Sequence, residues 1–172
     1  VDAVKKSKNK DRIRVTIVGE AVKNVEVEYS DALQLYIDSC GLSEVFELVK
    51  NVDVGLMKNY YTQNDICVLC SKNEAAAVSI IEAMSYGCAV ISTAKNGTAF
   101  ILEKDTGMIF NPFDIRELTN CIDLYFADPA AAEKMGNLAK QYVEVNCSGR
   151  AYIESLNRCL ENENYKFRVN ID

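Results

Sequence analysis

The segment Ile66–Ser92 constrains the fold of this chain more than any other. Its sequence, ICVLCSKNEAAAVSIIEAMSYGCAVIS, predicts a buried strand over 66–69, a helix over 78–86 closed by Gly87, and a second buried strand over 89–91. Both strands are short and continuously apolar, which is typical of parallel strands that are covered on both faces. The segment therefore predicts a βαβ unit.

The rest of the chain continues the alternation of strands and helices. Further strands are predicted over residues 12–18, 46–49 and 106–110, and helices over 54–63 and after Ser30, Asp114 (with Glu117 as a capping box), Asp128 and Ser148. Residues 20–29 are expected to form a loop, and the alternating Phe167, Val169 and Ile171 fit either a strand or a frayed end. The predicted fold class is α/β, with a Rossmann-like parallel sheet and helices on both faces.

Composition excludes several kinds of chemistry. The chain has no histidine, which removes Ser-His-Asp and Cys-His catalysis and the commonest zinc ligand. Its net charge of −6 argues against general nucleic-acid binding. No signal peptide is evident, and no apolar run approaches the ~20 residues needed to cross a bilayer.

The seven cysteines are expected to be free residues of the core, in a reducing compartment. Cys67 and Cys70 form a CxxC pair, but they fall on the strand predicted over 66–69 or at its end. Residues three apart on a strand point to opposite faces, so this pair is not expected to share a metal ion.

Two glutamates stand out in the otherwise apolar unit. Glu74 lies at the predicted loop–helix junction, and Glu82 lies within the helix. A buried carboxylate without a partner is costly, and no basic residue is an obvious partner nearby in the sequence. A ligand rich in hydroxyl groups would satisfy both carboxylates. The alternatives are that Glu82 pairs with a distant Lys or Arg and that Glu74 caps the helix.

The predicted helix start favours a nucleotide as this ligand. Ala75–Ala77 are small, so the free N–H groups of the helix start would be accessible to a diphosphate, although small residues also serve close packing. Glu82 shares a face with Val78 and Ser79, roughly 6–12 Å from the helix start at about 1.5 Å per residue. There it can accept hydrogen bonds from a ribose diol. Glu74 would then lie beside an attached sugar and favour positive charge at the anomeric carbon.

These residues resemble the signature of the group 1 family of retaining glycosyltransferases, which have the GT-B fold. The resemblance rests on Glu74, seven intervening residues, Glu82 and AMSYGCAVIS. It extends to NYYTQNDICVLCS, to TGMIFNPFD and to Gly97, which falls in the family's Gly–Gly loop, and it covers roughly Arg12 to Leu160. The implied fold is the C-terminal, donor-binding half of a GT-B enzyme.

The resemblance implies a role for each site residue. Glu82 would hold the ribose of a UDP-sugar or similar donor, and Glu74, the implied catalytic residue, would contact the donor sugar. The N–H groups near Ala77, Val78 and Ser79 would meet the phosphates, and the base would lie against Asn51 and Val52. The family's front-face reaction, in which the leaving diphosphate helps to take the acceptor proton, implies no metal and no cofactor.

Several positions depart from the family pattern. Alanine replaces a glycine at Ala75 and Ala77, and other departures are Lys50, Ala89, Asn96 and Phe100. The resemblance also implies that residues 1–172 form a single domain with a core at about 12–160. Its first strand, its diphosphate-binding Arg and Lys, and the N-terminal acceptor domain would lie upstream. We therefore expect this chain alone to bind the donor weakly and not to turn over.

The implied function is transfer of a sugar, with retention, from a UDP-sugar to a saccharide or lipid-linked acceptor in cell-surface polysaccharide biosynthesis. By analogy the protein is expected in the cytoplasm, with peripheral association at the inner face of the cell membrane through the upstream domain. Two other classes stay open. One is a GT-B-like sugar-nucleotide epimerase, and the other is a non-catalytic α/β binding module in which both glutamates are structural.

Overall fold

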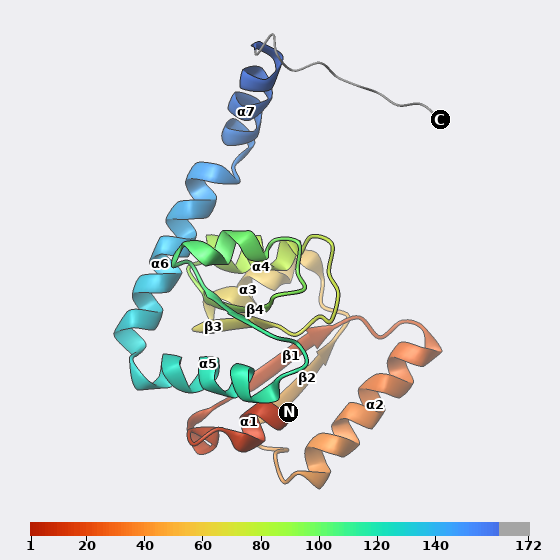
Figure 1. Ribbon diagram of the computed structural model, residues 1–172. Helices are drawn as coiled ribbons and strands as arrows, with labels where there is room; N and C mark the ends of the chain where they lie inside the picture. Colours follow the sequence, from red (N-terminus) through yellow and green to blue (C-terminus); the bar gives the residue numbers. More distant parts are fainter. Residues whose placement is uncertain (162–172) are drawn as a thin grey trace.

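A computed structural model describes residues 1–161, without the side chains of Glu103 and Lys104. The alternating residues Phe167, Val169 and Ile171 lie outside the described residues. Figure 1 shows strands in the middle of the molecule, helices on both sides of them, and a last helix that extends away from the body. No helix in the described part of the chain is long and apolar enough to cross a membrane.

The strands are parallel, as predicted, but their hydrogen bonds divide them into two sheets within the described residues. In the first sheet, β1 (Val15–Gly19) pairs with β2 (Phe46–Lys50). The second has the order β3-β4-β5, with β3 (Ile66–Leu69), β4 (Ala89–Thr93) and β5 (Met108–Phe110). One cluster of buried side chains joins the two sheets, with Phe46, Ile91 and Phe110 among its members. The predicted α/β class, with parallel strands and helices on both faces, is therefore confirmed, and its strands form two hydrogen-bonded sheets in this part of the chain.

The helices predicted from the sequence occur where expected, with one exception. The described helices are α1 (Asp2–Lys6), α2 (Asn24–Ser39), α3 (Met57–Thr62), α4 (Val78–Ser85), α5 (Ile115–Ala127), α6 (Pro129–Asn146) and α7 (Gly149–Glu161). Short 3-10 turns are η1 (Lys10–Arg12), η2 (Val54–Leu56) and η3 (Ala99–Lys104). The predicted caps at Asp128 and Ser148 are confirmed, since their side chains accept the N–H groups of Ala131 and Ala151.

The exception is α2, which begins at Asn24 rather than after Ser30. Lys23 takes the N-cap position, and its carbonyl oxygen accepts the N–H groups of Glu26 and Val27. The Glu26 carboxylate accepts the N–H groups of Val22 at 3.1 Å and Lys23 at 2.9 Å. The Glu26 carboxylate, at the third position of the helix, thus stabilises the start of α2 in place of a conventional N-cap side chain. The loop predicted over residues 20–29 is wrong from Asn24 onward.

The capping box predicted for α5 is half correct. Asp114 is the N-cap, and its carboxylate accepts the N–H of Arg116 at 2.9 Å. The Glu117 carboxylate instead accepts the N–H of Asn111 at 2.7 Å. Glu117 therefore fixes the turn between β5 and α5 rather than the cap itself.

A tight contact holds α4 in place. A Cβ built on Gly136 of α6 would lie 2.1 Å from the carbonyl oxygen of Gly87, in the turn between α4 and β4. Only a glycine lets the two backbones approach so closely. Around this contact α4 buries Ile80, Ala83 and Met84 in a second core cluster. The start of α4 is thereby fixed at the carboxyl ends of β3 and β4.

All seven cysteines are free. Cys88 and Cys121 are buried, as expected of core residues, whereas Cys70 and Cys147 are exposed. The prediction that all the cysteines belong to the core is therefore wrong for those last two.

Candidate functional site

The first residues of α4 present backbone N–H groups without acceptors. Ala77 is the N-cap, with φ −83° and ψ 96°, and no side chain caps the helix. Among the described residues, the N–H groups of Ala77, Val78 and Ser79 donate no hydrogen bond. Ala77 is buried, whereas the side chain of Val78 is exposed. A helix start of this kind carries a partial positive charge and can accept an anion.

Glu74 lies three residues before the N-cap rather than at the loop–helix junction. It forms a parallel bridge with Asn96: its N–H donates to the Lys95 carbonyl at 3.1 Å, and its carbonyl accepts the N–H of Gly97 at 2.9 Å. Within the described chain the half-buried Glu74 carboxylate has no hydrogen bond or ion pair. The alternative that Glu74 caps the helix is therefore wrong, because the backbone of Glu74 forms the bridge to Asn96 and the N-cap position belongs to Ala77.

The loop after β4 is rigid around Asn96. This buried side chain donates from Nδ2 to Ser92 Oγ at 3.0 Å, and its Oδ1 accepts from both the N–H and the hydroxyl of Thr98. Asn96 occupies the position of the family's first loop glycine, so the structure gives this departure a role in fixing the loop. The loop in turn fixes the backbone of Glu74 through the bridge.

Glu82 has a partner within the protein. The hydroxyl of Tyr61, in α3, donates to Glu82 Oε2 at 2.9 Å. The alternative of a Lys or Arg partner was wrong, since no described cation pairs with Glu82 and its partner is a tyrosine. Glu82 is half-buried, and its second oxygen, Oε1, has no hydrogen bond among the described residues.

Tyr61 is held from several sides. It is buried, its ring stacks on Tyr86 with the centroids 5.8 Å apart, and its carbonyl accepts the thiol of Cys88 at 3.0 Å. Burial, and then the hydrogen bond to Glu82, raise the pKa of Tyr61 above its ordinary value. The tyrosine therefore stays protonated at neutral pH and acts as a donor to the carboxylate.

Asn51 and Val52 follow β2, and η2, α3 and β3 come between them and α4 along the chain. Asn51 adopts a left-handed backbone with φ 56°, and its Oδ1 accepts the N–H of Ala21 at 2.8 Å. In the described residues, no hydrogen bond joins Asn51 or Val52 to the start of α4. The predicted site residues thus follow two different strands, β2 and β3, with η2 and α3 between them along the chain.

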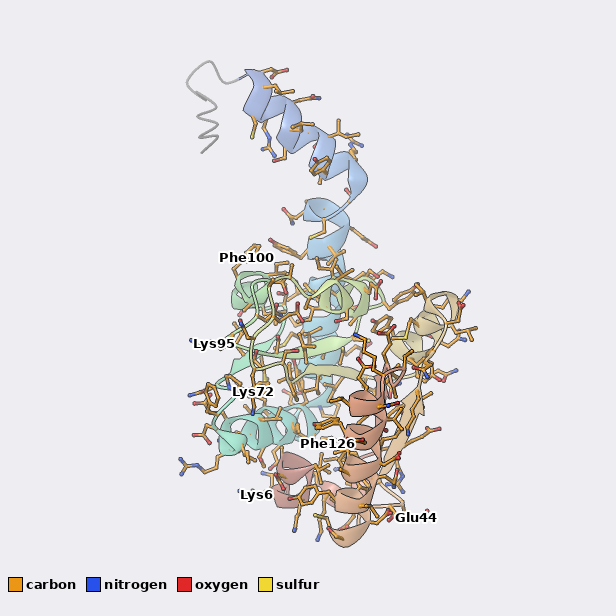
Figure 2. All side chains as sticks on the ribbon, turned by 90° about the vertical axis from the view of Figure 1, so that its right-hand side faces the viewer. Lys6, Glu44, Lys72, Lys95, Phe100 and Phe126 are labelled. Carbon is orange, nitrogen blue, oxygen red and sulfur yellow. The ribbon has the colours of Figure 1, made fainter. Side chains whose placement is uncertain are left out.

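Two lysines at the strand ends escaped the sequence analysis as candidate site residues. Lys72 and Lys95 follow β3 and β4, both are exposed, and they lie on the same side of the molecule (Figure 2). Neither forms an ion pair with a described residue. Their position just beyond the carboxyl ends of two parallel strands was the available signal. No three described His, Cys, Asp or Glu side chains gather into a possible metal site.

The parallel strands and the flanking helices, with an open helix start at the strand ends, define a Rossmann-like α/β class of domain. Residues 1–142 match the family model described as "Glycosyl transferases group 1", so the chain belongs to this family. The predicted resemblance is therefore confirmed.

Individual relatives agree with this assignment. The lipopolysaccharide core biosynthesis mannosyltransferase LpcC of Rhizobium leguminosarum bv. viciae is 29% identical over 131 residues, which are 76% of this chain and 37% of the relative. The chain thus spans well under half of this relative's length.

Two solved structures share the fold. The C-terminal domain of a group 1 family glycosyl transferase (LpcC) from Francisella tularensis has a TM-score of 0.77 at 21% identity, over 86% of this chain and 76% of that one. Anabaena Alr3699/HepE in complex with UDP has a TM-score of 0.75 at 20% identity, over 91% of this chain and 43% of that one. The fold is therefore that of the C-terminal domain of a GT-B enzyme.

Proposed function

We propose that this domain binds the nucleotide-sugar donor, a UDP-linked sugar, of a retaining glycosyltransferase. The observation that carries the proposal is the open start of α4, which lies in the chain between the unpartnered carboxylate of Glu74 and the half-satisfied carboxylate of Glu82. Membership of the group 1 family and the UDP complex of the structurally similar HepE support it.

Each part of the donor has a matching group. The diphosphate would accept hydrogen bonds from the N–H groups of Ala77, Val78 and Ser79. The ribose diol would donate to Glu82 Oε1. The backbone of Glu82 lies about 6 Å along the helix axis from that of Val78, at 1.5 Å per residue. The transferred sugar would lie against the Glu74 carboxylate, on the other side of the phosphates.

The base would meet the segment after β2. Because the Asn51 side chain already binds Ala21, its contact with a base would come from the backbone of Asn51 and from Val52. The base would thus be recognised after β2, whereas the diphosphate would be bound after β3.

The chemistry proposed is front-face transfer with retention. The bond between the anomeric carbon and the diphosphate oxygen breaks while the acceptor oxygen bonds to the same face, and the departing diphosphate takes the acceptor proton. Glu74 would stabilise the positive charge that develops at the anomeric carbon. This scheme assigns no step to a metal ion or a cofactor.

The acceptor, a saccharide or a lipid-linked saccharide, would be held by an N-terminal domain outside these residues. The activity would serve cell-surface polysaccharide biosynthesis at the cytoplasmic face of the membrane. The first strand of the donor domain would also lie outside. The chain alone would bind the donor but not transfer the sugar.

Saturation-transfer NMR on this chain with UDP, a set of UDP-sugars, GDP and NAD tests the proposal. We expect UDP to bind with saturation of its ribose protons, Glu82→Gln to weaken that binding at least about tenfold, and Glu74→Gln to affect only the sugar protons. Binding of NAD but of no sugar nucleotide, or ribose saturation unchanged in Glu82→Gln, would overturn it.

The catalytic part needs the protein with its upstream region restored. Glu74→Gln should then lower kcat for sugar transfer at least about a hundredfold while the affinity for UDP stays the same. Full activity of that variant would remove Glu74 from the mechanism.

A further inference from the structure

We infer that Tyr61 is a positioning residue, which holds the Glu82 carboxylate in the one orientation that can recognise a ribose diol. The inference rests on the proposed function and adds to it the group that makes the site selective for ribonucleotides. Its basis is the hydrogen bond from the Tyr61 hydroxyl to Glu82 Oε2 at 2.9 Å.

This hydrogen bond makes the two oxygens of the Glu82 carboxylate different. Oε2 is taken by Tyr61, and Oε1 has no partner among residues that the structure describes. A free Glu side chain would rotate about three bonds and lose that freedom on binding a diol. Here the hydrogen bond from Tyr61 already fixes the carboxylate in the unliganded protein, so less of this freedom remains to be lost when a diol binds.

Tyr61 itself is fixed well enough to do this. Tyr61 is only 8% exposed, and its ring lies nearly parallel to the ring of Tyr86, with 15° between their planes. Its backbone carbonyl accepts the Cys88 thiol. The position of the hydroxyl is thus set by α3, by α4 and by the turn before β4 together.

The hydroxyl can be separated from the rest of the side chain. The stacking uses the ring, and the bond from Cys88 uses the main chain, so both survive in Tyr61→Phe. Only the bond to Glu82 is lost. Tyr125→Phe is a matched control, since Tyr125 is a buried member of the other core cluster and donates its hydroxyl to the Val90 carbonyl at 3.2 Å.

The test compares UDP with 2′-deoxy-UDP, by NMR titration of the 172-residue chain. The wild-type chain should bind UDP at least about tenfold more tightly, because the deoxy compound lacks one hydroxyl that Glu82 accepts. Tyr61→Phe should reduce that ratio to about threefold or less by weakening UDP alone, and Glu82→Gln should remove it. Tyr125→Phe should keep the wild-type ratio, even where urea unfolding shows a similar loss of stability in both Phe variants.

The outcomes separate the two levels of the hypothesis. A wild-type ratio in Tyr61→Phe together with a lost ratio in Glu82→Gln overturns the role of Tyr61 and leaves the ribose contact of Glu82 in place. A wild-type chain that binds no UDP, or that binds both nucleotides equally, overturns the ribose contact and the role of Tyr61 together. If Tyr125→Phe lowered the ratio of UDP to 2′-deoxy-UDP affinity as much as Tyr61→Phe does, Tyr61 would have no role beyond packing.

Discussion

Gly97 lies so close to Ala75 that a Cβ on Gly97 would come within 1.9 Å of the Ala75 carbonyl oxygen. The contact is between two backbones, so no side-chain rotation can relieve it. It joins the loop after β4 to the segment that leads from Glu74 into α4.

Gly97→Ala should therefore force the two segments apart. We expect a loss of about 1–3 kcal/mol in the free energy of unfolding and weaker binding of UDP, measured by urea denaturation and NMR titration. Gly19→Ala is the control: a Cβ there meets nothing within 4 Å, so stability should change by no more than about 1 kcal/mol. Equal unfolding midpoints for the two variants would contradict the prediction.

Asn96→Ala removes the hydrogen bonds that fix the same loop. We expect it to lower the free energy of unfolding by about 1–3 kcal/mol, because the hydroxyls of Ser92 and Thr98 lose their buried partner. Asn146→Ala, which removes an exposed bond to the Tyr142 carbonyl, should stay within about 0.5 kcal/mol of the wild type. Similar losses in both variants, measured in urea, would argue against a special role for the Asn96 amide.

Val78→Pro tests the backbone contact to phosphate directly. Val78 is the first residue of α4 and Ala77 before it is already extended, so proline should fit there with little change in stability. The variant lacks one N–H at the helix start. We expect the Kd for UDP to rise about tenfold and the Kd for uridine, which has no phosphate, to stay the same.

Val78→Ala, which keeps the N–H, is the control and should bind UDP as the wild type does. An unchanged Kd for UDP in Val78→Pro would place the phosphates elsewhere.

The half-buried thiol of Cys67 should make the free energy of unfolding fall in alkaline solution. Burial is the main cause that raises its pKa from 9.0 to about 12 in the folded chain. Between these values the unfolded chain releases the proton and the folded chain retains it, so unfolding becomes easier as the pH rises from about 9 towards 12. The slope from this one group approaches about 1.4 kcal/mol per pH unit.

Cys67→Ala should remove that part of the slope. Free energies of unfolding at pH 7 give the packing cost of the substitution, and the difference between pH 9 and pH 10.5 gives the titration. Cys88, whose pKa is raised to about 11, contributes in the same direction and stays in both proteins. Parallel curves for the variant and the wild type would contradict the assignment to Cys67.

The elements from β3 to β4 could be predicted almost to the residue. Their signals are local: apolar runs of strand length, an apolar helix and Gly87, whose φ of 83° suits a helix end. Glu74, Glu82 and the helix start could be found for the same reason, because a single βαβ unit contains them.

Features that depend on distant contacts could not be predicted in this way. The Tyr61–Glu82 bond spans 21 positions and depends on how α3 packs beside α4, which no periodicity records. The start of α2 depends on the Glu26 carboxylate folding back to Lys23, and Ser30 offered a more conventional cap. The division into two sheets depends on which strand edges meet, and the pattern of apolar residues is the same in either arrangement.

The bridge between Glu74 and Asn96 also has a consequence for protein engineering. Since the segments after β3 and β4 share backbone hydrogen bonds and the Gly97–Ala75 contact, they form one mechanical unit. If only one of them were grafted from a relative, its backbone would not match the hydrogen bonds and the close contact of the other segment. A chimera meant to take a different substrate would have to carry both segments from the same parent.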